Sequence, residues 1–172
     1  MQNGVVVAIC RAVATRGIAA LRFNFRGVGG GQGSFGNGVG ERIDATAALA
    51  KLKALPDVLP GRIGIAGYSF GAAVALFATD STTRAVVAVS TPTIARDASE
   101  IDVRCPALFV VGGRDQSATV DCISRLGPSV GPEAKLAEVP AADHSWTGLE
   151  GELAVIVSSF LADVLMAAAA RD

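Results

Sequence analysis

The sequence contains few residues of the kinds that build metal sites, disulfide frameworks or nucleic-acid surfaces. Its 172 residues include three cysteines and a single histidine. Cys10, Cys105 and Cys122 are odd in number, widely spaced and without metal-ligand spacing, which indicates free, buried thiols in a reducing cytoplasm. The formal net charge is −1, so no electrostatic attraction to nucleic acid or to an anionic membrane surface is expected.

The sequence has little that would direct the chain into or across a membrane. The first residues lack the basic n-region of a signal peptide, and Arg11 interrupts their apolar stretch. The apolar stretch at 153–170 has the length of a membrane span, but Asp163 and two serines lie within it. We predict instead a final amphipathic helix packed on a sheet, which gives the same pattern. With 51% hydrophobic residues, the chain can form a sizeable core as a single domain over residues 1–172.

Helical and extended patterns alternate along the chain. Apolar residues spaced i, i+3, i+4 and i+7 from Val6 predict an N-terminal helix ended by Gly17, although the β-branched run near its start keeps a strand reading open. Short apolar runs predict five strands, at Ile18–Phe23, Arg62–Gly67, Ala85–Ser90, Pro106–Gly113 and 134–140. Further helices are predicted at 41–55, 70–79, 118–126 and 149–170. Most of these strands are apolar throughout, as in sheets buried on both faces. The expected fold class is therefore α/β, a three-layer α/β/α sandwich with a mostly parallel sheet.

A glycine-rich loop follows the first predicted strand and raises the question of nucleotide binding. It contains a literal G-x-G-x-x-G at Gly31, Gly33 and Gly36. The dinucleotide fingerprint needs a tight turn between strand and helix, whereas this strand ends near Phe25 and the helix starts near Glu41. No Walker sequence accompanies it. The loop is then either a flexible surface connection or a loop that lines a site, and the rest of the sequence favours the second.

The stretch Gly67-Tyr68-Ser69-Phe70-Gly71 is a G-x-S-x-G motif placed directly between a predicted strand and a predicted helix. In that context the serine occupies a sharp, strained turn, and the glycines remove side chains that would clash with neighbouring backbone. The helix N-terminus behind it directs N–H groups and a positive dipole toward a developing oxyanion. The motif predicts that Ser69 is a nucleophile. The alternative is a Gly/Ser turn that only joins strand to helix.

A serine nucleophile needs a base, and the base needs an acid to orient it. His144 is the only histidine, and it follows the last predicted strand, at the same edge of the sheet as Ser69. Asp115 follows the fourth predicted strand and is the expected acid. Asp143 and Asp121 are the alternatives. Neighbours in sequence rarely face each other, which disfavours Asp143, and Asp121 falls on a predicted helix.

These motifs, in this order, resemble a small-hydrolase branch of the α/β-hydrolase superfamily, near the dienelactone-hydrolase-like proteins. The order serine, aspartate, histidine is the one expected for that fold. The similar blocks are "LRFNFRGVGGGQGSF", "GERIDATAAL", "GIAGYSFGAAVA", "VVGGRD" and "ADHSW", and they span nearly the whole chain. The resemblance therefore implies a minimal α/β-hydrolase fold.

The resemblance also implies an activity and a set of site residues. It implies a carboxylesterase-type serine hydrolase that cleaves small carboxylic esters through an acyl-enzyme, with no metal or organic cofactor. It gives the backbone N–H of Phe70 a role in the oxyanion hole. It places Tyr68, Arg26 and Gly27 at the substrate pocket, whose edge the glycine-rich loop shapes. Lactone, thioester and peptide substrates stay open, because a triad alone does not choose among them.

The chain departs from the family pattern at its start. Family members usually begin with further strands, and a loop after the last of these supplies a second oxyanion donor. Here residues 1–3 align with the start of the first helix. The strand in question normally lies between those predicted at Ile18–Phe23 and Arg62–Gly67, so a gap or an exposed edge is expected there. Either the sheet closes up, or residues 4–10 fill the place as a strand, or a partner chain covers it in a homodimer. A misassigned start or a truncated chain is a simpler possibility.

Two further expectations complete the interpretation. The stretch from Ser90 to Cys105 is the only insertion between core strands after the nucleophile, and it is too short for a large cap domain. An open site that favours short acyl groups follows. The second function, from another class, is a degenerate hydrolase fold that serves as a binding or assembly module, which the missing oxyanion loop motivates.

Overall fold

Four short apolar segments pair as a parallel sheet in the computed structural model, which describes residues 2–92, 100–126 and 129–167. The strands lie in space in their chain order, as β1 (Ile63–Tyr68), β2 (Thr83–Val89), β3 (Ala107–Gly112) and β4 (Lys135–Val139). β2 and β3 are buried along nearly their whole length, which their continuously apolar sequences predict.

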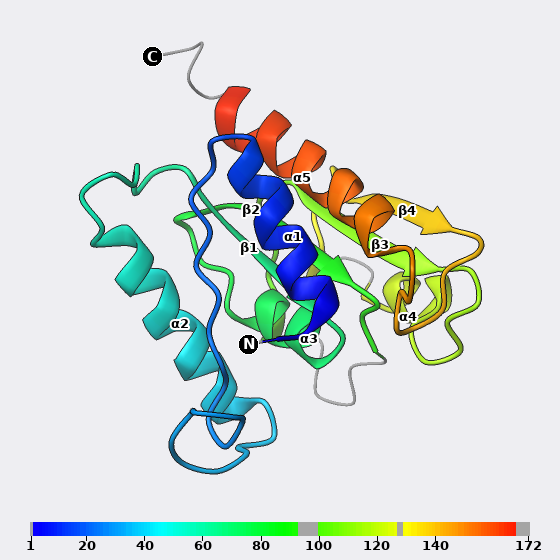
Figure 1. The fold of residues 1–172 in the computed structure, drawn as a ribbon, viewed down its shortest axis with the longest axis horizontal. Helices are drawn as coiled ribbons and strands as arrows, with labels where there is room; N and C mark the ends of the chain where they lie inside the picture. Colours follow the sequence, from blue (N-terminus) through cyan, green and yellow to red (C-terminus); the bar gives the residue numbers. More distant parts are fainter. Residues whose placement is uncertain (1, 93–99, 127–128, 168–172) are drawn as a thin grey trace.

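Helices cover both faces of this sheet (Figure 1). On one face α1 (Gly4–Thr15) and α5 (Glu150–Ala167) lie side by side and share a core with β2 and β3. On the other face lie α3 (Phe70–Phe77) and α4 (Val120–Ser124), while α2 (Val39–Lys53) packs against α3. The predicted α/β class, with three layers and a parallel sheet, is confirmed.

The N-terminal helix is confirmed, and its ends follow from local chemistry. The side chain of Asn3 accepts a hydrogen bond from the N–H of Val6 at 3.1 Å and so caps the first turn. Gly17, directly beyond the C-cap, has a φ of 76°, a left-handed conformation that glycine adopts without a steric penalty. The alternative in which residues 4–10 form a strand is wrong, because they form the first turns of α1.

The strand predicted at Ile18–Phe23 is also wrong. The segment has no strand pairing and is drawn as coil in Figure 1, and Leu21 and Phe23 are 42% and 37% exposed. A groove of about 720 Å³ lies between this segment and β1, so the two do not pair. An apolar run becomes a strand only where a neighbouring strand takes up its backbone hydrogen bonds. The expectation that the sheet closes up is therefore wrong as well, and a covering partner chain stays a prediction.

α5 is the helix whose sequence raised the question of a membrane span. Its apolar residues, among them Leu153, Val157 and Leu161, are buried against the sheet and α1. Within the described part of the chain, no helix is both long and apolar enough to cross a membrane. Residues 168–170 of the predicted final helix lie outside the described residues, as do residues 93–99 of the insertion considered as a lid.

A buried carboxylate organises the glycine-rich loop. Glu41, in the first turn of α2, is fully buried, and its two oxygens accept hydrogen bonds from the N–H groups of Gly36 and Gly38 at 2.8 Å. Burial alone would raise the pKa of Glu41. The backbone hydrogen bonds and the nearby charge of Arg26 outweigh burial and lower that pKa. The protein's own carboxylate thus occupies amides that a phosphate cradle would need, which argues against the nucleotide-binding interpretation.

We expect Glu41→Gln to destabilise the protein by about 1–2 kcal/mol at neutral pH, because a neutral amide replaces a charged acceptor of two N–H groups. A lowered pKa in the folded state contributes stability above the unfolded value, near 4.3, and this contribution is lost as pH falls through the folded pKa. The variant should therefore lose less stability than the wild type on acidification below about pH 5. Urea unfolding from pH 7 to pH 3.5 measures both effects.

Glu133→Gln, on an exposed residue, is the control. Equal pH dependence in the wild type and Glu41→Gln would contradict this role.

Candidate active site

Ser69 lies on the turn between β1 and α3, in a conformation that few residues adopt. Its φ is 53° and its ψ is −121°. Its N–H donates to the carbonyl of Val89 at 2.9 Å and so continues the β1–β2 ladder into the turn. Gly67 lies so close to the backbone oxygen of Gly71 that any Cβ would collide with it. The absence of a side chain at Gly67 therefore permits the sharp turn that places the Ser69 side chain at the carboxyl edge of the sheet.

The structure brings Ser69, His144 and Asp115 together in one chain of hydrogen bonds. Ser69 Oγ lies 2.9 Å from His144 Nε2, and His144 Nδ1 lies 2.8 Å from Asp115 Oδ2. The tautomer with its proton on Nδ1 satisfies both contacts, because Nε2 is then free to accept the hydroxyl proton of the serine. All three residues follow strands of the same parallel sheet, which is why residues far apart in sequence meet at one edge.

Asp115 is held by its own turn as well as by the histidine. Its side chain is completely buried. Oδ1 accepts hydrogen bonds from the N–H groups of Ser117 and Ala118 at 2.9 and 3.0 Å, and Oδ2 faces His144. One oxygen therefore fixes the carboxylate and the other orients the imidazole. This division of contacts suits the acid of a triad.

The two alternative acids have other partners. Asp143 Oδ1 accepts hydrogen bonds from the N–H groups of Ser145 and Trp146 at 3.0 and 2.9 Å, so it caps the turn that carries His144. Asp121 pairs with Arg125 on the exposed surface of α4 at 2.7 Å. Neither carboxylate contacts the imidazole.

A buried tryptophan secures the histidine loop against the core. Trp146 is fully buried with a φ of 58°, and its indole N–H donates to Ser90 Oγ at 3.0 Å. Ser90 follows β2 and also has a positive φ, 48°. The turn after β2 thus supports the loop after β4, on which His144 lies.

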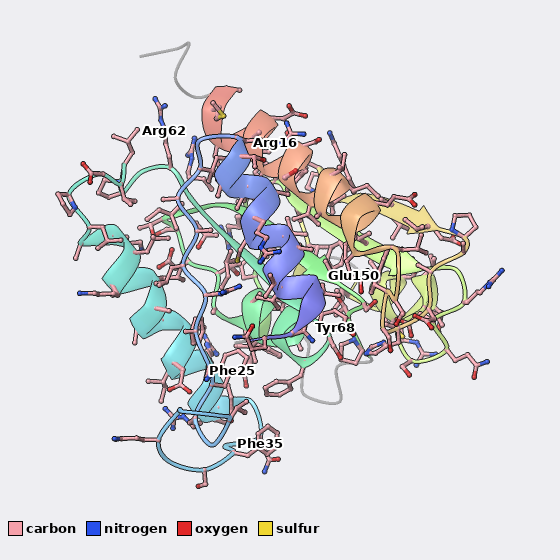
Figure 2. The ribbon with its side chains drawn as sticks, viewed as in Figure 1. Arg16, Phe25, Phe35, Arg62, Tyr68 and Glu150 are labelled. Atoms are coloured by element: carbon pink, nitrogen blue, oxygen red, sulfur yellow. The ribbon has the colours of Figure 1, made fainter. Side chains whose placement is uncertain are left out.

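Tyr68 contacts the triad from the end of β1, where it is labelled in Figure 2. Its hydroxyl donates to the backbone carbonyl of His144 at 2.7 Å, and the two rings lie 5.7 Å apart. Burial, and then the charges of Asp115 and Asp143, raise the pKa of Tyr68, so the phenol keeps the proton that it donates. The contact ties the histidine loop to the strand that carries Ser69.

Phe70, the first residue of α3, supplies a backbone N–H that has no acceptor within its own helix. This amide, together with the positive end of the helix dipole, is suited to binding an oxyanion beside Ser69. The Phe70 ring packs near those of Phe25 and Phe35, with centroids 5.8 and 5.4 Å apart. Phe35 is 60% exposed and belongs to the glycine-rich loop, so this loop reaches the residue beside the nucleophile. Figure 2 labels Phe25 and Phe35 in the lower part of the view, near the loop at the bottom.

Two residues predicted at the substrate pocket have contacts elsewhere. The guanidinium of Arg26 binds Asp44 on α2, with a shortest distance of 2.7 Å. The hydrogen bonds from Arg26, stronger than the opposing effect of burial, lower the pKa of Asp44. Gly27, with a φ of 70°, donates its N–H to the carbonyl of Gln32 within the loop. The structure thus brings Tyr68 to the triad, while Arg26 anchors the glycine-rich loop to α2.

Sequence reasoning missed two residues and gave a third another role. The Trp146 indole supports the histidine loop, and the Glu41 carboxylate holds the glycine-rich loop through its amides. Tyr68 was expected at the substrate pocket, whereas its hydroxyl binds the backbone carbonyl of His144, a partner distant in sequence. Among the described residues, no group of three or more His, Cys, Asp or Glu side chains could hold a metal ion.

The whole arrangement is similar to that of solved α/β serine hydrolases. An alpha-beta serine hydrolase homologue from Coxiella burnetii is 29% identical with a TM-score of 0.83, and the match covers 94% of this chain and 77% of that one. An α/β serine hydrolase without lid from Xanthomonas campestris is 27% identical with a TM-score of 0.83, covering 96% and 75%. These likenesses support a hydrolytic enzyme.

Sequence comparisons agree with the structural ones. An uncharacterized protein of Rickettsia prowazekii (strain Madrid E) is 46% identical over 76 residues, which make up 44% of this chain and 32% of that protein. The family model of the dienelactone hydrolases matches residues 36–166, which include Ser69, Asp115 and His144. The match extends over well more than half of the sequence, and the chain belongs to the dienelactone hydrolase family.

Proposed function

We propose that this chain is a carboxylesterase-type serine hydrolase that cleaves small carboxylic esters through an acyl-enzyme on Ser69. The observation that carries the proposal is the continuous chain of contacts from Ser69 Oγ through His144 to Asp115, at 2.9 and 2.8 Å, on a strained turn at the amino end of α3. Membership of the dienelactone hydrolase family supports it.

All three side chains of the triad take part in acylation. Ser69 Oγ attacks the acyl carbon while His144 Nε2 takes the hydroxyl proton. The imidazolium that forms is stabilised by Asp115, which stays ionised. The carbonyl oxygen becomes negative in the tetrahedral intermediate and accepts a hydrogen bond from the N–H of Phe70. When the intermediate collapses, the ester C–O bond breaks and the alcohol leaves with the proton from Nε2.

Deacylation repeats these steps with water as the nucleophile. His144 Nε2 takes a proton from water, and the resulting hydroxide attacks the acyl carbon. The bond to Ser69 Oγ then breaks, and the serine oxygen recovers its proton from the imidazolium. The carboxylic acid is released, so one water is consumed for each ester cleaved.

A preference for short acyl groups fits the exposure of the site. The His144 side chain is 34% exposed, so substrate can reach the triad directly from solvent. The similar Xanthomonas campestris structure is described as lacking a lid. An open site buries little of a long acyl chain and gains little binding energy from it.

A cytoplasmic location of the protein stays a prediction.

The first test is hydrolysis of p-nitrophenyl acetate and butyrate by the wild type and Ser69→Ala. We expect wild-type hydrolysis above background and a loss of about 1,000-fold or more in the variant, because the nucleophile is removed. p-Nitrophenyl laurate should react more slowly than butyrate. A fluorophosphonate probe should label the wild type and not Ser69→Ala.

Two outcomes would reject parts of this proposal. Faster turnover of laurate than of butyrate would contradict the short-acyl preference. Equal, near-background rates in the wild type and Ser69→Ala, with no fluorophosphonate labelling of well-folded protein, would reject esterase activity. A binding or assembly module would then be the better description.

Tyr68→Phe separates positioning from substrate binding. Loss of the hydrogen bond to the His144 carbonyl, worth about 1 kcal/mol, should lower kcat about fivefold with little change in KM. The phenylalanine keeps the ring and its packing, so the melting temperature should stay close to that of the wild type. Steady-state kinetics on p-nitrophenyl butyrate measure the two constants separately. A raised KM with an unchanged kcat would instead support Tyr68 as a substrate-binding residue.

A further inference from the structure

The glycine-rich loop presents a large apolar side chain to solvent beside the nucleophile. Phe35 is 60% exposed, and its ring centroid lies 5.4 Å from that of Phe70, the residue that follows Ser69. The two rings are tilted by 55°. We call the rings of Phe35 and Phe70 the aromatic shelf. The shelf adjoins the backbone N–H of Phe70, which is suited to binding the oxyanion.

The backbone on both sides of the Phe35 ring is fixed. A single exposed phenylalanine has no meaning by itself, since folded proteins expose many apolar side chains. Here, however, Glu41 binds the N–H groups of Gly36 and Gly38, which follow Phe35 directly. Gly27 packs so closely that any Cβ on it would lie 3.1 Å from the backbone nitrogen of Phe35. An exposed ring on a fixed backbone can bind a ligand with little loss of conformational freedom.

The shelf offers aromatic surface and not charge. Arg26, in the same loop, has its guanidinium bound by Asp44. Aromatic rings pair with one another in tilted, edge-to-face or offset arrangements, and such pairs are favoured beyond the apolar area that they bury. Phe25 and Phe70 meet in this way at 5.8 Å, and Phe70 and Phe35 at 5.4 Å. Phe35 is the exposed end of this series, and its solvent side is open to one further ring.

We propose that the aromatic shelf selects esters that carry an aromatic ring one methylene from the ester group, on their alcohol side or their acyl side. This inference rests on the proposed function, whose substrate class it narrows. With the carbonyl carbon at Ser69 Oγ and the carbonyl oxygen at the N–H of Phe70, a ring one methylene away would pack against Phe35. Phe35 is then a specificity-determining residue that takes no part in bond making.

A long alkyl chain is the competing ligand, and it fits the shelf less well. A flexible chain loses the freedom of many rotatable bonds when it lies on a surface, and an open surface buries little of its area in return. An aromatic ring is rigid, and it pairs with Phe35 in the same geometry that Phe70 already uses. A benzyl ester of a short acid also keeps the preference for short acyl groups.

The exposed apolar surface continues from Phe35 onto α2. Val39 and Ile43 follow at intervals of four residues and are 51% and 61% exposed. Ile43 lies one helical turn beyond Val39 and makes no part of the shelf. It therefore provides a matched control, an exposed apolar residue of the same region without an aromatic ring.

Two matched pairs of esters test the selection. Benzyl acetate and cyclohexylmethyl acetate carry the ring on the alcohol side, and methyl phenylacetate and methyl cyclohexylacetate carry it on the acyl side. The saturated ring is at least as apolar, so burial of area alone would not favour the aromatic ester. We expect kcat/KM, measured by titration of the released acid, to be about three- to tenfold higher for the aromatic ester in at least one pair. The pair that shows this preference identifies the side of the ester that contacts Phe35.

Three variants test the role of Phe35. Phe35→Leu keeps an apolar side chain and removes the ring, so the ratio of kcat/KM within the preferred pair should fall to about one. Phe35→Tyr keeps the ring and should keep the wild-type ratio, as should Ile43→Ala. Circular dichroism and the melting temperature check the fold of each variant. The wild-type ratios need no variant, so they test the selection even where Phe35→Leu does not fold.

A binding measurement separates this inference from the proposed function. Ser69→Ala cannot form the acyl-enzyme, so NMR titration with the four esters measures binding without turnover. We expect the aromatic ester of the preferred pair to bind about three- to tenfold more tightly than its saturated partner, and the double variant Ser69→Ala/Phe35→Leu to lose this difference. If the wild type hydrolyses none of the esters while this difference is observed, the esterase activity is rejected and the aromatic selection stands.

Three results would overturn the selection. Hydrolysis of all four esters with ratios near one in both pairs would keep the esterase activity and reject the shelf. An undiminished preference in Phe35→Leu would assign the selection to other residues. Ratios near one, together with self-association in light scattering that both Phe35→Leu and Ile43→Ala abolish, would assign the exposed surface to an interface between copies of the chain.

Discussion

The left-handed backbone at Ser69 is the constraint on which the geometry of the site depends. A non-glycine residue in such a conformation costs about 1–3 kcal/mol and persists only where its surroundings hold it. Here the hydrogen bond to Val89 and the close approach of Gly67 to Gly71 provide that support. These contacts involve β2 and α3, whose apolar side chains pack together in one buried cluster. The core of the sandwich therefore stabilises the strained turn.

The other two triad residues depend on this sheet in the same way. Asp115 and His144 follow β3 and β4, and each has one contact that suits catalysis and others that fix its position. The amides of Ser117 and Ala118 hold Asp115, and Tyr68 holds the His144 carbonyl. Because these supports lie in a parallel sheet whose carboxyl ends meet at one edge, small displacements of a strand would be transmitted to the proton-transfer distances.

The sequence predicts well the features that local patterns determine, such as the triad. It predicts less well the features that depend on contacts with residues distant in the chain. The G-x-S-x-G motif between strand and helix, the single histidine and the aspartate after β3 led directly to the triad that the structure brings together. The apolar run Ile18–Phe23 has the composition of a strand but no strand to pair with, so its composition was misleading. Arg26 looked like a pocket residue because its loop reaches the site, yet its charge is bound by Asp44, 18 positions away, which no local pattern shows.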